Sequence, residues 1–108
     1  MTTNANGKKF GMVNRIVTKP GQRDAVADIL LSGAKMQGGM AGCEIYVVHV
    51  STADPNEIWV TEVWRSKADH EASLKDADVR ALIERGRPMI SSIVPTLTTA
   101  VGGKGLDV

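Results

Sequence analysis

The chain has 108 residues, of which 43% are hydrophobic and 23% are charged, and its formal net charge is +1 at pH 7. This length allows one hydrophobic core but not two, and the ordinary composition suggests neither a disordered nor a membrane-spanning class. The near-neutral charge gives no electrostatic reason to expect nucleic acid or a membrane surface as a partner. We therefore expect one small domain that binds a small molecule or another protein.

The two ends and the single cysteine set further limits. The polar residues 1–9 contain no apolar run typical of a signal peptide or a membrane span. We expect a flexible tail over 1–9, one domain over 10–101 and a second tail over 102–108. Cys43 is the only cysteine, which excludes an intramolecular disulfide and a cysteine-based metal cage. A cytoplasmic location fits this cysteine usage best.

The first predicted element is a strand over Phe10–Thr18, because apolar side chains alternate along it. Asn14 is the one polar member of an otherwise apolar row. Pro20 suits the first turn of a helix, so we expect the chain to enter a helix there. Gly38 and Gly39 end the helical pattern.

A hairpin of two strands is predicted next. The β-branched run Glu44–Ser51 is typical of a strand, and Asp54-Pro55-Asn56 is typical of a tight turn. The following strand, Glu57–Arg65, alternates again, so its side chains project to two opposite faces. One face carries Ile58, Val60, Glu62 and Trp64, and the other carries Trp59, Thr61, Val63 and Arg65.

Two helices and a last strand complete the pattern. Ser66 and Asp69 match a capping box, which predicts a short helix starting there. A second helix is expected from about Asp78 and should end near Pro88, which cannot continue a helix. The Thr- and Val-rich segment Val94–Val101 predicts a fourth strand, and its proline restricts that strand to an edge of the sheet.

The order β, α, β, β, α, β predicts an α+β, ferredoxin-like fold, in which an antiparallel sheet carries helices on one face. The other face keeps apolar side chains, and a single-layered sheet does not leave such a surface in water without a partner. We therefore predict a homodimer that packs sheet on sheet. The residues assigned to this interface are Val13, Val17, Tyr46, Val48, Trp59 and Val63.

Motifs for common cofactors are missing from the sequence. No glycine-rich loop leads from a strand into a helix, so nucleotide and flavin binding are not indicated. His49 and His70 are the only histidines and have no closely spaced ligand neighbour, so we expect no metal site. No Gly-x-Ser-x-Gly turn supports hydrolase chemistry.

Three segments carry a resemblance to a known family: Asn14–Gln22, Asp54–Asn56 and Thr61–Ala68. In their order they resemble the antibiotic biosynthesis monooxygenase family, and the resemblance spans Phe10–Val101. It implies a dimeric α+β barrel. It also implies oxygenation of a quinol or polycyclic phenol by O₂, without flavin, haem or metal.

The resemblance also implies roles for individual residues. Asn14 and Trp64 match pocket residues on the first strand and at the end of the third strand. His70 and Arg80 are the nearest counterparts of an aromatic residue in the next helix and an arginine in the last helix. Haem degradation, found in another branch, is not favoured, because this chain has a serine and an isoleucine where that branch needs a tryptophan and an iron-ligating histidine.

A cofactor-free oxygenase must convert an acidic hydroxyarene into its anion, so its pocket needs a base, an oxyanion partner and little water. Asn14 can bond to an oxyanion, and Trp64 can stack on a flat ring. His70 can accept the proton, and Glu62 is the rival base. We expect these four to be catalytic, and the residues expected to contact the substrate are Met12, Val60, Arg80 and Ile83.

Each candidate also has a purely structural explanation. Asn14 can bond to neighbouring backbone, and Trp64 can fill the core. His70 can face solvent near the start of its helix. Glu62 can be a buried acid that pairs with an arginine of the covering helix, namely Arg80, Arg85 or Arg87.

Two functions follow from these patterns. The first is a cofactor-independent monooxygenase that oxidises a small quinol or polycyclic phenol, with O₂ as co-substrate. The alternative is a non-catalytic dimeric protein of the same fold that binds a small hydrophobic molecule or acts as an accessory or stress protein. The aromatic content of 4% modestly favours the alternative. An open apolar pocket where Asn14 and His70 converge would favour the first function.

Overall fold

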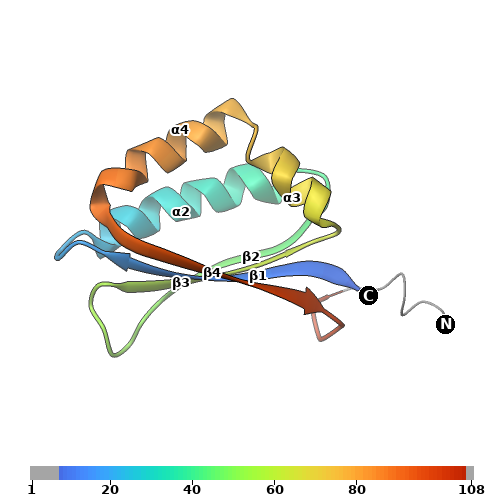
Figure 1. The fold of residues 1–108 in the computed structure, drawn as a ribbon, viewed down its shortest axis with the longest axis horizontal. Coiled ribbons are helices and arrows are strands. Elements are labelled where there is room, and N and C mark those ends of the chain that lie inside the picture. Colours follow the sequence, from blue (N-terminus) through green and yellow to red (C-terminus); the bar gives the residue numbers. More distant parts are fainter. Residues whose placement is uncertain (1–7, 107–108) are drawn as a thin grey trace.

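The computed structural model describes residues 8–106. Four strands form one antiparallel sheet in the order β2-β3-β1-β4, and the helices cover one face of it (Figure 1). This arrangement confirms the predicted α+β, ferredoxin-like fold. The elements are β1 (Lys9–Thr18), α2 (Arg23–Gly38), β2 (Cys43–Val50), β3 (Glu57–Trp64), α3 (Lys67–Ser73), α4 (Ala77–Gly86), a 3₁₀ turn (Arg87–Met89) and β4 (Ile90–Ala100).

The core lies between the two central strands and α2. Ile16 of β1, Ile58 and Val60 of β3 and Val26 of α2 form one cluster, in which no side chain is more than 4% exposed. Burying one such aliphatic side chain contributes about 1.5–3 kcal/mol. This cluster therefore holds α2 against the sheet and fixes the distance between the helix and the sheet.

β2 presents the opposite faces from those expected. Tyr46 pairs with Glu62 and Val48 pairs with Val60, so both β2 residues share the helix-covered face of the sheet. Both also pack against the core cluster. The assignment of Tyr46 and Val48 to the outer face is therefore wrong. Alternation within one strand does not fix which of its faces is covered, because the register with the neighbouring strand decides that.

The start of α2 also differs from expectation. Pro20 and Gly21 form a turn, and Gly21 has φ 78°, a left-handed conformation that glycine adopts without a steric penalty. The helix begins at Arg23, so Pro20 precedes it instead of lying in its first turn. The helix ends at Gly38, as predicted.

α3 begins at the predicted cap. The Ser66 hydroxyl accepts the backbone N–H of Asp69 at 3.1 Å, which satisfies one free donor of the first turn. The Asp69 carboxylate does not reach back to a backbone N–H; it accepts hydrogen bonds from the Ser66 hydroxyl and from the Arg65 guanidinium at 2.8 Å. This link ties the end of β3 to α3.

β4 is an edge strand and is longer than predicted. It begins at Ile90, directly after the 3₁₀ turn that contains Pro88. Pro95 lies in its interior, which an edge position tolerates because one side of the strand has no partner strand. The helical pattern therefore ends close to where the proline was expected to end it.

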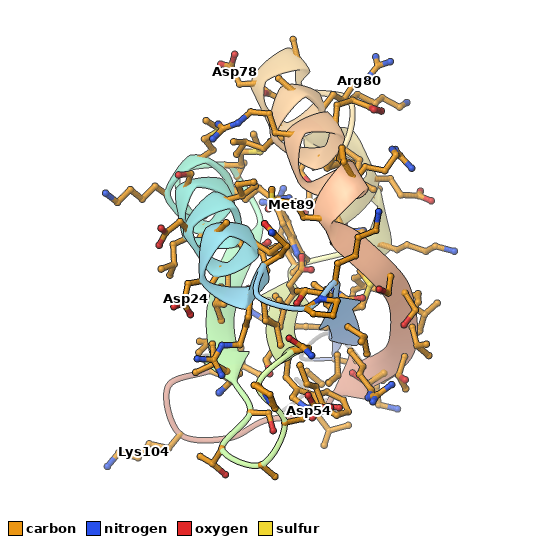
Figure 2. The ribbon with its side chains drawn as sticks, turned by 90° about the vertical axis from the view of Figure 1, so that its left-hand side faces the viewer. Asp24, Asp54, Asp78, Arg80, Met89 and Lys104 are labelled. Carbon is orange, nitrogen blue, oxygen red and sulfur yellow. The ribbon has the colours of Figure 1, made fainter. Side chains whose placement is uncertain are left out.

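The two longer helices lie side by side over the sheet. Figure 2 shows Asp78 and Arg80 of α4 at the end of the molecule that lies far from the sheet. Within the described residues, no helix has both the length and the apolar character needed to cross a membrane.

The two expected tails lie only partly within the described residues. Most of the tail expected over 1–9 lies outside the described residues, and Lys9 already belongs to β1. After β4, residues 102–106 form neither helix nor strand.

Candidate active site

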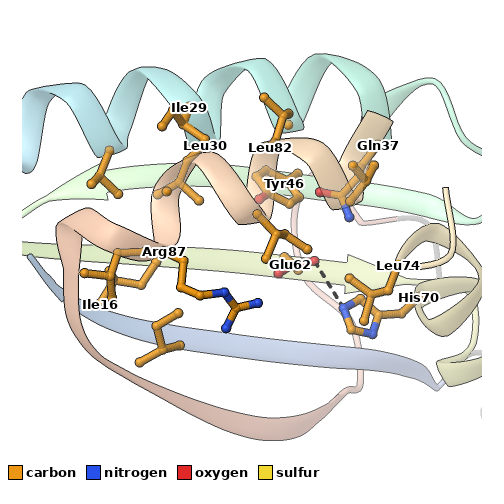
Figure 3. A pocket seen from close by; sticks show the side chains of 17 residues that line it. Ile16, Ile29, Leu30, Gln37, Tyr46, Glu62, His70, Leu74, Leu82 and Arg87 are labelled. Atoms are coloured by element: carbon orange, nitrogen blue, oxygen red, sulfur yellow. Dashed lines mark ion pairs between the residues drawn. The ribbon is translucent and has the colours of Figure 1, made fainter. Parts of the chain in front are cut away.

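A cavity of about 420 Å³ lies between the sheet and the helices α2 and α4 (Figure 3). This volume falls in the range of about 300–1,000 Å³ that is usual for small-molecule sites. The walls are largely aliphatic. The polar or charged side chains that line the cavity are Gln37, Tyr46, Glu62, His70 and Arg87.

Glu62 provides the carboxylate at the sheet side of the cavity. The residue is 5% exposed. Asn14 Nδ2 donates to its Oε2 at 3.1 Å, and Trp64 Nε1 donates to its Oε1 at 2.9 Å. Such hydrogen bonds to a carboxylate are strong and directional. The carboxylate is thus held in one orientation by two neutral donors.

The structural explanation for Glu62, an ion pair with an arginine of α4 or the following turn, does not apply among the described residues. Arg87 pairs with Glu84 at 3.2 Å, and this pair is exposed. No described ion pair joins Glu62 to Arg80 or Arg85. The carboxylate therefore faces the cavity without a bonded guanidinium.

His70 stands beside this carboxylate, and its side chain is only 11% exposed. Its Nε2 lies 3.8 Å from Glu62 Oε1, which is longer than a hydrogen bond. The ring of Phe10 lies 5.3 Å from the imidazole between centroids, and the ring of Trp64 meets it edge-on at 5.5 Å. The imidazole is therefore packed between aromatic rings. The structural explanation of His70 required an imidazole that faces bulk solvent, so it does not apply.

A chain of buried hydrogen bonds fixes α3 against α2. Gln37 Nε2 donates to Ser73 Oγ at 3.1 Å, and Ser73 Oγ donates to the backbone oxygen of His70 at 2.6 Å. The turn that carries the imidazole is thus tied to the neighbouring helix. Sequence reasoning missed Gln37, because a single uncharged polar residue near a helix end carries no distinctive pattern.

Tyr46 was also missed, because it was assigned to the outer face. It stands next to Glu62 on the covered face, and burial together with the negative charge of Glu62 raises the pKa of its hydroxyl. Tyr46 therefore stays protonated at neutral pH and offers an O–H donor to the cavity. Only the pairing of Tyr46 with Glu62 across β2 and β3 indicates that Tyr46 belongs to the site.

The four predicted catalytic residues form one cluster around Glu62. Glu62 and His70 line the cavity, whereas Asn14 and Trp64 are not among its lining residues and contact it through Glu62. Trp64 is fully buried, so in this arrangement it orients the carboxylate and offers no face for a flat ring to stack on.

The four residues predicted to contact the substrate are scattered. Ile83 lines the cavity. Met12 and Val60 are buried in the core and do not line it. Arg80 is exposed on the side of α4 that faces away from the sheet, as Figure 2 shows. Arg87, which was named only as a partner for Glu62, lines the cavity instead.

Other groups near the site are less reactive. Burial and the charges of Glu62 and Glu44 raise the pKa of the Cys43 thiol, which makes it a weaker nucleophile at neutral pH. In the part of the chain that the structure describes, no three His, Cys, Asp or Glu side chains gather closely enough to hold a metal ion. Glu62, His70 and Tyr46 can transfer protons and form hydrogen bonds at the cavity.

Comparisons with known proteins point to one family. A family model described as antibiotic biosynthesis monooxygenase matches residues 9–85. A crystal structure from Chloroflexus aurantiacus J-10-fl, described as a candidate antibiotic biosynthesis monooxygenase, has 41% identity and a TM-score of 0.84, and the match covers 92% of this chain and 99% of that chain. A search of curated proteins found no match.

Two further solved structures share the fold at low identity. PA3566 from Pseudomonas aeruginosa has 16% identity and a TM-score of 0.82, with 90% of this chain and 98% of that chain covered. A variant of SnoaB, a cofactor-independent oxygenase from Streptomyces nogalater, has 14% identity and a TM-score of 0.78, with 89% and 96% covered. At these identities the likeness concerns the fold.

Proposed function

The chain belongs to the antibiotic biosynthesis monooxygenase family, and from this premise we propose that it oxidises a small quinol or polycyclic phenol with O₂ and without a cofactor. The observation that carries the proposal is the pair of Glu62 and His70 on the wall of an aliphatic cavity. A substrate ring in that cavity would bring its hydroxyl to a fixed carboxylate and an imidazole.

The first proposed step removes the proton of the substrate hydroxyl. Glu62 is the proposed base that accepts this proton, and the imidazole of His70, whose Nε2 lies 3.8 Å from Glu62 Oε1, offers a second hydrogen-bonding group to the substrate oxygen. Asn14 and Trp64 keep the carboxylate in the orientation that receives the proton. A positioned base of this kind contributes about 10²–10⁴-fold to a reaction rate.

The second proposed step uses the ring anion as the electron source. The anion reduces O₂, one oxygen atom bonds to a ring carbon, and the other leaves as water with the two hydrogens lost from the carbon and the hydroxyl. A phenol and O₂ thus give a quinone and water, and no external reductant is consumed. The aliphatic walls limit the access of water to the reactive intermediate.

The absence of a cofactor is part of the proposal, because the substrate supplies all the electrons that this reaction needs. Family membership supports it, and so does the likeness of fold to SnoaB, which is a cofactor-independent oxygenase. The lone Cys43 suits a reducing compartment, so we further propose a cytoplasmic location.

Oxygen uptake tests the proposed function. The purified protein is supplied with a panel of hydroquinones and anthrones, and the autoxidation of each compound alone is subtracted. We expect protein-dependent consumption of one O₂ for each oxidised product. Tight binding of panel compounds without any oxygen consumption would contradict the proposal and favour a non-catalytic binding protein.

We also propose that two copies of the chain pack through the outer face of the sheet. The helices all lie on the opposite face (Figure 1). On the outer face, Val47, Trp59 and Val94 are 44%, 36% and 52% exposed. A second copy would remove this apolar surface from water and would do so symmetrically.

A further inference from the structure

Helix α2 contains a buried glycine, Gly33, in its interior. Glycine is one of the least favourable residues inside a helix, so its presence calls for a reason. Gly33 is not among the glycines with positive φ. A Cβ atom placed on it would meet its nearest neighbours at 3.8 Å, which is ordinary van der Waals contact. The backbone and the packing around it would therefore accept alanine.

The space beside Gly33 belongs to the cavity. The three atoms nearest to a Cβ there are Gln37 Oε1, the Tyr46 hydroxyl and Leu82 Cδ1, and all three residues line the cavity together with Gly33. Figure 3 shows Gln37, Tyr46 and Leu82 near α2, with Glu62 on the sheet below them. A methyl group on Gly33 would therefore occupy cavity space next to two polar atoms.

These two polar atoms offer one donor and one acceptor. Gln37 uses its amide N–H group to bond to Ser73, which leaves Oε1 as an acceptor. The raised pKa of Tyr46 keeps its hydroxyl protonated, so it can donate. Within residues 8–106, neither Gln37 Oε1 nor the Tyr46 hydroxyl has a hydrogen-bond partner. Both atoms remain accessible and are not fully buried. One hydroxyl of a ligand can accept from Tyr46 and donate to Gln37 at the same time.

We propose that Gly33, Gln37 and Tyr46 form a second polar subsite, which binds a second hydroxyl of the substrate and makes Gly33 a specificity-determining position. The inference rests on the proposed function in one respect, which is that the first hydroxyl lies at Glu62. The preferred substrate is then an aromatic diol that spans the cavity. One of its hydroxyls contacts the sheet, and the other lies under α2.

Binding of two probes that differ by one hydroxyl tests this subsite. The probes are 2-naphthol and 2,6-dihydroxynaphthalene, measured by titration calorimetry without oxygen so that no turnover contributes. One satisfied hydroxyl is worth about tenfold in affinity, so the protein should bind the diol about tenfold more tightly. Tyr46→Phe and Gly33→Ala should each reduce this preference to about twofold or less.

Gly38→Ala is the matched control, because Gly38 lies on the same helix and does not line the cavity, and a Cβ atom placed on it would have nothing within 4 Å. It should keep the full preference for the diol. Gly33→Ala should also raise the midpoint of thermal unfolding by about 4 °C, since alanine is the better helix former. A lowered midpoint would mean that packing requires the glycine and would overturn the proposal.

Two further results would overturn the subsite: equal affinity of the unmodified protein for both probes, or an unchanged preference in Tyr46→Phe and Gly33→Ala. A diol preference that these variants remove, in a protein that consumes no oxygen, would support the subsite and contradict only the proposed oxygenase activity.

Discussion

Strand β3 carries one three-residue pattern twice, once on each face of the sheet. Glu57-Ile58-Trp59 begins the strand and Glu62-Val63-Trp64 ends it. In each copy the indole N–H donates to the glutamate two residues earlier, at 3.1 Å in the first and 2.9 Å in the second. The two copies project to opposite faces, because they are offset by an odd number of residues.

The partners from β1 make the two copies different. Arg15 donates to Glu57 at 2.6 Å, and this bond is the main cause that lowers the pKa of Glu57. Asn14, the adjacent residue on the other face, donates to Glu62. The outer glutamate is therefore neutralised by a cation, and the inner one is oriented by neutral groups beside a cavity. Both copies share the pattern Glu-x-Trp. The environment of each glutamate is decided by the face of the sheet on which it lies and by its partner from β1.

Replacing the two glutamates separately gives the largest expected contrast. Glu62→Gln removes the proposed base and should lower the rate of oxygen consumption by about 10²–10⁴-fold. Glu57→Gln makes the same change in the outer copy and should alter the rate by no more than about twofold. Similar losses in both variants, measured with folded proteins, would mean that Glu62 has no special role.

A charge introduced on the outer face of the sheet should weaken the proposed dimer. In dilute solution the protein should have about twice the 11.5 kDa mass of the chain. Val47→Lys places a charge in the middle of the outer face and should weaken the dimer by about 100-fold, in line with the cost of an unpaired charge at an interface. Light scattering across a dilution series measures the mass of the assembly and the affinity of the dimer.

Leu31→Lys serves as the control for that change, since Leu31 is 50% exposed on α2 and lies away from the outer face. It should leave the dimer intact. A protein that is monomeric at every concentration would disprove the sheet-on-sheet arrangement.

Replacing Trp64 should affect stability and oxidation rate more than replacing Trp59. Trp64→Phe removes the inner indole N–H from a fully buried position and should lower the free energy of unfolding by about 2 kcal/mol and the oxidation rate by about tenfold. Asn14→Ala should lower the rate by a similar factor. Trp59→Phe should change both quantities little. Unchanged turnover in Trp64→Phe and Asn14→Ala would show that the orientation of Glu62 is unimportant.

The smallest expected effect concerns acid stability. The pKa of Glu57 is lowered in the folded state, so its ion pair stabilises the protein above the ordinary value of 4.5, and this contribution is lost as the pH falls through the lower folded pKa. Glu57→Gln should therefore slightly lower the midpoint of thermal unfolding at pH 7, and the difference from the unmodified protein should shrink toward pH 3. A difference that grows in acid would have the wrong sign.

The sequence predicted what depends on a single strand or helix. The alternation along β3 correctly grouped Ile58, Val60, Glu62 and Trp64 on one face of the strand, because one strand alone sets that period. It did not predict that Tyr46 shares this face, since inter-strand register decides that. The bond from Gln37 to Ser73 joins residues that are 36 positions apart, and no local pattern encodes such a contact.

The most direct measurement is the fate of isotopically labelled oxygen. A quinol or anthrone is oxidised under ¹⁸O₂ and the product is examined by mass spectrometry. One labelled atom should enter the product with the unmodified protein and with Glu57→Gln, and protein-dependent labelled product should form about 10²–10⁴-fold more slowly with Glu62→Gln. Product that carries no label, or labelled product that forms equally fast with Glu62→Gln, would contradict the assignment of the inner glutamate as the base of a monooxygenase.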